Sequence, residues 1–378
     1  MKKIISFYLP QYYEFKENNE WWGKGFTEWT NVKKAKPLYV GHYQPTIPYH
    51  NYFYSLDSKE TIMWQIKLAK EHGIYGFCFY HYWFGNGRKL MEKPVEMFLN
   101  DLRLDIPFCL CWANHNWTRT WTGGDTDILM EVKYGGEDAY REHFEYLLPY
   151  FTDARYIKKD NKPIFLIYMP ELIPNLALMK TLFDKWCKEE GLAGIYFVSQ
   201  APIAAINRDK YRQSIDYSIL YEPNYTQQYV TMCLKTGKII NAFKESPSNT
   251  ISVVKNALKK RANKLLFAGK IDKMRLTNFS YDGTWKAIIK RKIRGKEYWP
   301  GIFMGYDNTP RKGYGGTVYR NGSPDKFKKY LKKFMSNIHD SDCYIFCMAW
   351  NEWGEGAYLE PDQVHGLQYL EAIKHTVK

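Results

Sequence analysis

The 378-residue chain contains no apolar run long enough to span a bilayer. Its first residues, MKKIISFYLP, enter a strand-like pattern directly and show neither the apolar core nor the cleavage site of a signal peptide. Low-complexity tracts are absent, and a hydrophobic fraction of 45% argues against an intrinsically disordered chain. We therefore expect a folded, cytoplasmic protein with a large core.

Cysteine is scarce, and its number is odd, seven. Five of the seven lie in apolar, strand-like runs and are typical of small buried hydrophobic residues: Cys78, Cys109, Cys111, Cys343 and Cys347. Cys109 and Cys111 would share one strand face, which does not suit a disulfide, and no second ligand pair completes a zinc motif. The pattern indicates a reducing compartment, and we expect neither a metal nor an organic cofactor.

Phosphate-binding motifs are missing as well. The sequence has no P-loop, no Asp-x-Asp and no Gly-rich turn after the first strand-like run. This absence argues against an open, doubly wound sheet, which is the main alternative fold. It also argues against a reaction that uses an activated sugar donor.

Acidic residues are outnumbered, and the net charge is +14. Between Lys255 and Lys296 the sequence has fourteen Lys/Arg and two Asp, a local excess of +12. The segment is either a solvated basic surface or a contact for an anionic glycan, a phosphate or a membrane surface. No nucleic-acid motif accompanies it, so we expect no nucleic-acid partner.

Eight strand-like apolar runs alternate with helical patterns along the chain. The predicted strands cover residues 3–9, 75–83, 107–112, 163–169, 195–199, 217–221, 301–306 and 344–350. The predicted helices cover residues 58–72, 94–102, 139–151, 176–190, 252–267, 326–338 and 367–377. The alternation predicts an α/β fold, a (β/α)8 TIM-type barrel that forms one catalytic domain over residues 1–378, with a basic insertion at about 224–298.

Aromatic residues are abundant, with 13 Trp and 32 Tyr, more than a core requires. Sugars stack their C–H faces on such rings. Barrel enzymes place their reactive groups at the carboxyl ends of strands, and these ends are rich here in hydroxyls, amides, indoles and acids. We therefore predict one crater that binds a polar, ring-shaped ligand. The candidate substrate-binding residues are Tyr8, Gln11, Trp29, His81, Tyr82, Trp83, Trp112, Asn114, His115, Tyr168, Glu222, Tyr306, Asp307, Arg311, Asn351 and Trp353.

Two of these candidates have open roles. Trp29 belongs to a loop, residues 21–32, that also carries Glu28. Its indole either packs beneath the barrel mouth or forms a wall for sugar stacking. Arg311 either binds a carboxylate or phosphate of the ligand or orients Asp307.

The run AWNEWGEG at residues 349–356 carries the strongest chemical signal. It places Glu352 and Glu355 three residues apart, beside two indoles, after a buried strand. A bare Glu-x-x-Glu usually caps a loop or bridges to arginines. Two carboxylates beside aromatic walls are what glycosidic bond chemistry needs, because one gives a proton while the other acts as base or nucleophile.

Several long motifs resemble the WbsX-type family, which is related to glycoside hydrolase family 99. They are FYLPQY at 7–12, WWGKGFTEWTNV at 21–32, GFCFYHYWF at 76–84, CWAN at 111–114, YDNTPR at 306–311, and WNEW at 350–353 followed by EPD at 360–362. The resemblance extends from residue 3 to residue 372. It implies a (β/α)8 barrel and carbohydrate chemistry.

The resemblance also implies roles for the two glutamates. WbsX-type proteins are usually described as glycosyltransferases of O-antigen and capsule synthesis, whereas the related hydrolases are retaining endo-α-mannosidases thought to form a 1,2-anhydro sugar. On that pattern, Glu352 is the base that removes the 2-hydroxyl proton. Glu355 is the acid that protonates the leaving oxygen and then activates the acceptor.

One segment departs from the family pattern. The family is expected to read Ala-Asn-Glu-Asn-Trp-Thr-Arg and then Arg-Trp-Asp-Gly, whereas this chain has His115 in place of the acid. Thr120 and Thr122 replace the two charged groups that follow. The departure implies a changed sugar preference, because both C-terminal glutamates are kept.

Three functions are consistent with these observations. The first is a retaining, glycoside hydrolase-like enzyme that cleaves or transfers a glycosidic bond of a bacterial-type surface polysaccharide. The second is a glycosyltransferase of O-antigen or capsule synthesis that uses an activated donor. The third is a non-catalytic barrel that binds glycans, and the presence of both glutamates argues against it.

Overall fold

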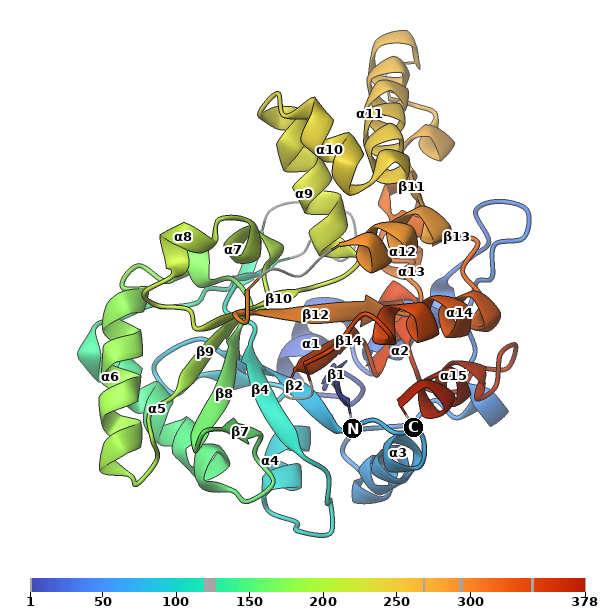
Figure 1. Ribbon diagram of the computed structural model, residues 1–378. Helices are drawn as coiled ribbons and strands as arrows, with labels where there is room; N and C mark the ends of the chain where they lie inside the picture. Colours follow the sequence, from blue (N-terminus) through green and yellow to red (C-terminus); the bar gives the residue numbers. More distant parts are fainter. Residues whose placement is uncertain (1, 119–126, 268, 292–294, 341–342, 378) are drawn as a thin grey trace.

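A computed structural model describes residues 2–118, 127–267, 269–291, 295–340 and 343–377. Within these residues, eight parallel strands close into a barrel (Figure 1). They are β1 (Lys3–Tyr8), β2 (Gly76–Trp83), β4 (Phe108–Trp112), β8 (Lys162–Ile167), β9 (Tyr196–Ser199), β10 (Tyr217–Leu220), β12 (Tyr298–Phe303) and β14 (Tyr344–Met348). Each strand pairs with its neighbour in chain order, and β1 pairs with both β2 and β14. The predicted (β/α)8 barrel is confirmed.

Helices connect the strands and cover the outside of the barrel (Figure 1). They include α3 (Lys59–Glu71), α4 (Lys93–Leu99), α5 (Glu137–Thr152), α6 (Leu176–Glu189), α7 (Pro202–Ile206), α8 (Arg208–Tyr211), α14 (Pro324–Met335) and α15 (Gln368–Val377). Helix α3 shows why they form where they do. The Ser58 hydroxyl accepts a hydrogen bond from the Thr61 N–H at its start, and Ile62, Ile66 and Ala69 form its buried face.

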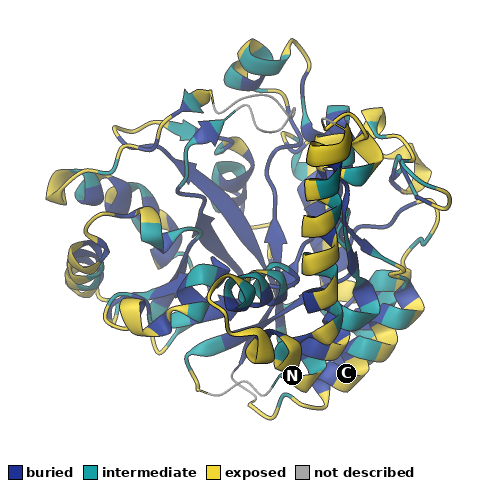
Figure 2. Ribbon diagram, turned by 90° about the horizontal axis from the view of Figure 1, so that it is seen from above, coloured by how far each residue is buried: buried dark blue, intermediate teal, exposed yellow. Residues whose placement is uncertain are grey.

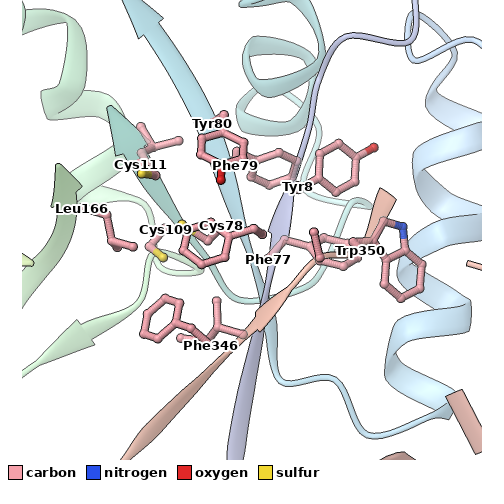
Figure 3. Close-up of a cluster of buried hydrophobic side chains, with 14 of the residues drawn as sticks. Tyr8, Phe77, Cys78, Phe79, Tyr80, Cys109, Cys111, Leu166, Phe346 and Trp350 are labelled. Atoms are coloured by element: carbon pink, nitrogen blue, oxygen red, sulfur yellow. The ribbon is translucent and has the colours of Figure 1, made fainter. Parts of the chain in front are cut away.

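The core follows the two-residue period of the strands. In β2, Phe79 packs outward against Phe98 of α4, with ring centroids 5.2 Å apart, whereas Tyr80 packs inside the barrel at 5.6 Å from Phe7. Cys78 and Cys109 are paired across β2 and β4, and Figure 3 shows these thiols among the buried rings. All seven cysteines are buried and unbridged, and the predicted burial is confirmed for Cys78, Cys109, Cys111, Cys343 and Cys347.

The predicted insertion lies between β10 and β12. It comprises α9 (Asn224–Lys235), α10 (Ile239–Glu245), α11 (Pro247–Phe267), the short strand β11 (Thr277–Ser280) and α12 (Tyr281–Lys290). Strand β11 pairs with β13 (Thr317–Arg320) from the connection between β12 and α14, and this pairing ties the insertion to the barrel. Helices α9, α10 and α12 are absent from the sequence prediction, and α11 begins five residues earlier than predicted.

The last barrel strand ends earlier than predicted, at Met348. The chain then forms a short antiparallel hairpin of β15 (Asn351–Glu352) and β16 (Ala357–Tyr358), joined by a 3-10 turn over Trp353–Glu355. The two glutamates therefore lie on a hairpin at the carboxyl end of the barrel. Over the described residues, no helix is both long and apolar enough to cross a membrane.

Candidate active site

The hairpin that carries the glutamates is fixed to the end of β1. The Asn351 amide donates to the Leu9 carbonyl at 3.0 Å and accepts from the Leu9 N–H at 2.8 Å. The Tyr12 hydroxyl donates to the Asn351 carbonyl at 2.5 Å and accepts from the Trp353 N–H at 3.1 Å. Asn351 therefore positions the neighbouring Glu352 by anchoring the hairpin to the end of β1. Its own side chain is fully buried and does not line the cavity.

One arginine connects three carboxylates in this site. Arg311 lies on the short helix α13 (Thr309–Lys312), and Glu28 begins α2 (Glu28–Lys34). The guanidinium donates from Nε to Glu28 at 2.7 Å, from Nη1 to Glu355 at 2.7 Å and from Nη2 to Glu352 at 3.0 Å. A guanidinium can bind several carboxylates at once because its N–H donors point outward in one plane, whereas a lysine offers a single compact ammonium group.

Burial sets the protonation of this cluster. The side chains of Glu28, Arg311 and Glu352 are 0%, 8% and 9% exposed, and Glu355 is 22% exposed. Loss of hydration raises the pKa of Glu352 to about 8; Arg311 opposes the rise, and the neighbouring Glu355 and Glu28 add to it. Burial likewise raises the pKa of Glu28. Glu352 is therefore largely protonated at neutral pH in the unliganded site.

The two C-terminal glutamates face a cavity of about 290 Å³ inside the carboxyl end of the barrel. Five tyrosines line it: Tyr80, Tyr82, Tyr168, Tyr221 and Tyr306. Burial raises the pKa of all five, so their hydroxyls stay neutral. The wall offers phenol faces for stacking and hydroxyls that both donate and accept hydrogen bonds. The remaining lining residues are Leu9, Ala113, His115, Asn224, Asn308, Arg311, Lys312 and Met348.

Seven predicted site residues meet at this cavity: Tyr82, His115, Tyr168, Tyr306, Arg311, Glu352 and Glu355. His115 lies beside Tyr168, with ring centroids 5.2 Å apart, and burial lowers its pKa, so its ring is neutral. Arg311 binds Glu28, Glu352 and Glu355, and its two predicted roles, toward a ligand anion or toward Asp307, stay predictions. The two substitutions at Thr120 and Thr122 lie outside the described residues.

Three predicted residues of β2 and β4 face the helices instead. Because side chains alternate along a strand, Tyr82 points inward while His81 and Trp83 point outward. His81 Nε2 lies 2.9 Å from Nε2 of His143 on α5, and the Trp83 ring stacks on the same imidazole at 4.9 Å. The indole of Trp112 donates to the Trp83 carbonyl. Burial lowers the pKa of His81 to about 3, so this is a neutral, structural pair.

The aromatic residues predicted near β1 support the hairpin from behind. The Tyr8 hydroxyl donates to Gln65 of α3, and the Trp29 indole donates to the Tyr54 carbonyl. The Trp29 and Trp353 ring centroids lie 5.5 Å apart, with the rings tilted by 55° to each other. Trp29 thus has the packing role, and neither tryptophan lines the cavity. The side chain of Gln11 is also fully buried and does not line the cavity.

Three further predicted residues hold loops at the rim. Asn114 exchanges two hydrogen bonds of 2.8 Å with the backbone of Met169, which joins the ends of β4 and β8. Glu222 pairs with Arg291 of the insertion. Asp307 accepts from Gln44 and contacts His42 at 2.6 Å, in a neighbouring cavity of about 180 Å³.

Glu28, Tyr80 and Tyr221 belong to the site or its support but are not predicted from sequence. Tyr80 lies in an uninterrupted buried run, where only the barrel register shows which side chains point inward. Glu28 reaches the site from 283 residues away in the chain. Among the described residues, no three or more His, Cys, Asp or Glu side chains are arranged so that they could hold a metal ion.

A closed (β/α)8 barrel with paired carboxylates and tyrosines at the carboxyl ends of its strands has the architecture of carbohydrate-active enzymes. The model of the family described as "Glycosyltransferase WbsX" matches residues 4–373, and the chain belongs to this family of carbohydrate-active proteins. Over 99% of its length, the chain is 30% identical to the uncharacterized protein WxcX of Xanthomonas campestris pv. campestris, in two strains. The chain spans about half the length, 49%, of these curated relatives.

Solved structures share the fold at low identity. The GH99 endo-alpha-mannosidase from Bacteroides thetaiotaomicron is 16% identical with a TM-score of 0.53, over 99% of this chain and 96% of that one. A glycoside hydrolase-like protein is 13% identical with a TM-score of 0.57, over 100% of this chain and 94% of that one.

Proposed function

We propose that the protein cleaves or transfers a glycosidic bond of a surface polysaccharide with net retention, using Glu352 and Glu355. The observation that carries the proposal is the pair of glutamates on one buried guanidinium at the end of a tyrosine-lined cavity. Two carboxylates in one site with different burial are the arrangement that separates an acid from a base. The fold of the GH99 endo-alpha-mannosidase supports it.

The reaction we propose has two balanced steps. First, Glu352 removes the proton of a 2-hydroxyl, O2 attacks the anomeric carbon, and the glycosidic C–O bond breaks as Glu355 protonates the leaving oxygen. Second, Glu355 takes a proton from water or an acceptor hydroxyl, which opens the 1,2-anhydro ring. Glu352 then returns its proton to O2. Two inversions at the anomeric carbon give retention.

The surroundings suit these roles. A base with a pKa of about 8 is stronger than an ordinary glutamate and better matched to a sugar hydroxyl. Arg311 contacts both carboxylates and stabilises whichever is ionised. Glu355 is the more exposed of the two, which suits a group that must meet a leaving oxygen and then an acceptor.

The product pattern tests the proposal. We expect the purified protein, incubated with surface polysaccharide and no nucleotide sugar, to release shortened glycan whose first anomer, seen by NMR, has the configuration of the substrate. Chain growth only when a nucleotide sugar is present would contradict this and make the protein a donor-dependent transferase. The family description and Lys312, a cation on the cavity wall, favour that second function.

Glu355→Gln tests the site. It removes the acid while keeping the shape, so we expect turnover to fall about a hundredfold to ten-thousandfold with glycan binding and folding kept, because a positioned general acid contributes about this much. Glu189→Gln, on the exposed end of α6, is the matched control and should keep full activity. Full activity of Glu355→Gln would refute the assignment.

We also propose a cytoplasmic location, which the seven unbridged thiols support.

A further inference from the structure

Helix α11 has its polar and apolar faces reversed. Asn249, Asn256 and Asn263, spaced by seven residues, form its buried face. A stripe of Ile251, Val254, Leu258 and Leu265 faces solvent, with exposed fractions of 57%, 44%, 63% and 70%. The two sets lie on opposite sides of the helix, because a two-residue offset rotates the chain by about 200°. In Figure 2, the long helix α11 is coloured as exposed along much of its length.

Hydrogen bonds hold the helix in this orientation. The Asn256 amide donates to the Asn278 carbonyl at 3.0 Å and accepts from its N–H at 3.3 Å. Asn263 makes the same double bond, both at 3.1 Å, with the backbone of Ile271. Rolling the helix to bury its leucines would break these pairs and leave buried amides unsatisfied. The apolar stripe is therefore a fixed outer surface.

The stripe is flanked by positive charge alone. From residue 246 to residue 271 the sequence has six Lys/Arg and no Asp or Glu. Lys255 and Arg261 are exposed within one turn of Leu258 on either side of it, and Lys264 precedes Leu265. An occupant of this surface must therefore be apolar at its centre and anionic around it.

We propose that α11 docks on the surface of an anionic lipid bilayer. Helices that lie in a membrane interface combine an apolar stripe with flanking Lys and Arg, which meet acyl chains and headgroups respectively. A second copy of the chain fits less well, because two α11 helices would bring lysines and arginines together with no acidic side chain on either helix. At 21 residues, α11 offers a contact about 30 Å long.

The insertion connects the docking helix to the cavity wall. Helix α9, which packs against α11 and extends with it from the barrel in Figure 1, begins at Asn224 on the cavity wall. Arg291 fastens the base of the insertion to the barrel rim by an ion pair to Glu222, and it also pairs with Glu245 of α10. The docking itself does not depend on the proposed reaction.

Vesicle sedimentation with the full chain tests this proposal. We expect binding to vesicles of phosphatidylcholine mixed with phosphatidylglycerol at about 0.1 M salt, and at least tenfold weaker binding to phosphatidylcholine alone. Binding should weaken again at about 1 M salt, where the Debye length is about 3 Å. The variants I251S/L258S/L265S and K255E/R261E/K264E should each lose at least tenfold in partition coefficient.

Matched controls distinguish an effect of the α11 surface from a general effect of surface charge or hydrophobicity. K328E/K329E/K332E makes the same charge change on α14, whose apolar face is buried. L102S/L172S/L178S removes three leucines that are exposed elsewhere. Both controls should bind vesicles as the wild type does.

Three results would overturn the proposal. The first is no binding to anionic vesicles at low salt, and the second is an equal loss in the α14 control. The third is a dimer, seen by ultracentrifugation without vesicles, that I251S/L258S/L265S dissociates; the stripe would then be an interface between copies. All substitutions lie at exposed positions, so circular dichroism should show an unchanged fold.

Discussion

The raised pKa of Glu352 makes the rate strongly dependent on pH, in a direction that reports its role. A pKa of about 8 leaves about one-tenth of Glu352 ionised at pH 7 and about one-hundredth at pH 6. With a leaving group that departs without a proton from Glu355, such as nitrophenolate, only Glu352 must be in the right form, which is the ionised one that takes the 2-hydroxyl proton. For such a substrate kcat/KM should rise about tenfold per pH unit from 6 to 7 and level off above 8. The pH profile of kcat/KM reports the pKa values of the free enzyme, and the raised pKa of Glu352 belongs to that unliganded state.

A variant sharpens this test. Glu28 is one of the negative neighbours that raise the pKa of Glu352, and it occupies one donor of Arg311. Glu28→Gln removes that charge and leaves the arginine to the remaining carboxylates. Both changes favour the ionised form of Glu352, so the rising limb should move to lower pH.

The assay is release of nitrophenolate from a nitrophenyl glycoside of the substrate saccharide between pH 6 and pH 9. It is paired with a 13C NMR titration of the Glu carboxyl carbons without substrate, in which Glu352→Gln identifies the resonance. The reasoning is refuted if kcat/KM is flat from pH 6 to pH 7. A fall of about tenfold per unit above pH 8 would show that Glu352 acts in its protonated form, and the roles of the two glutamates would be exchanged.

Two further predictions follow from the same cluster. Arg311→Met leaves buried carboxylates without their cation and should cost about 3–5 kcal/mol in the free energy of unfolding, measured with urea; a loss below about 1 kcal/mol would show that the ion pairs do not hold the site together. Gly354→Ala should abolish most activity, because a Cβ there would lie 1.8 Å from the Glu28 carboxylate and 2.8 Å from Arg311. Gly136→Ala, where a Cβ meets nothing within 4 Å, is its control, and equal activity of the two variants would contradict the argument.

The barrel is predictable from sequence because each strand can be predicted from a short stretch of neighbouring residues. Alternation of apolar runs and helical patterns is a property of short windows, and the closed order of strands follows from eight such units. The insertion is less predictable, because the apolar residues of α10 and α11 do not mark a core. Helix α11 buries asparagines and exposes leucines, so the usual inference from hydrophobic pattern to burial fails there.

The candidate site is predictable only in part, for a similar reason. Glu352 and Glu355 can be identified from sequence because tryptophans and glycines are their close neighbours in the chain. In β2, however, Tyr82 and His81 have equal claims from sequence, since every residue of that strand is buried. Only the pairing of β2 with β1 and β4 decides which one faces inward, and that depends on residues far apart in the chain.

The charge balance of the site explains why one of its glutamates must hold a proton. If Glu28, Glu352 and Glu355 were all ionised, one guanidinium would face three negative charges in a buried place, a net charge of −2. Such an excess is costly away from water, and the least expensive relief is a bound proton. Burial and its neighbours favour Glu352 as the carrier. Glu352 must lose that proton before it can act as a base. The same burial that makes it a strong base therefore also lowers the fraction of Glu352 that is ionised at neutral pH.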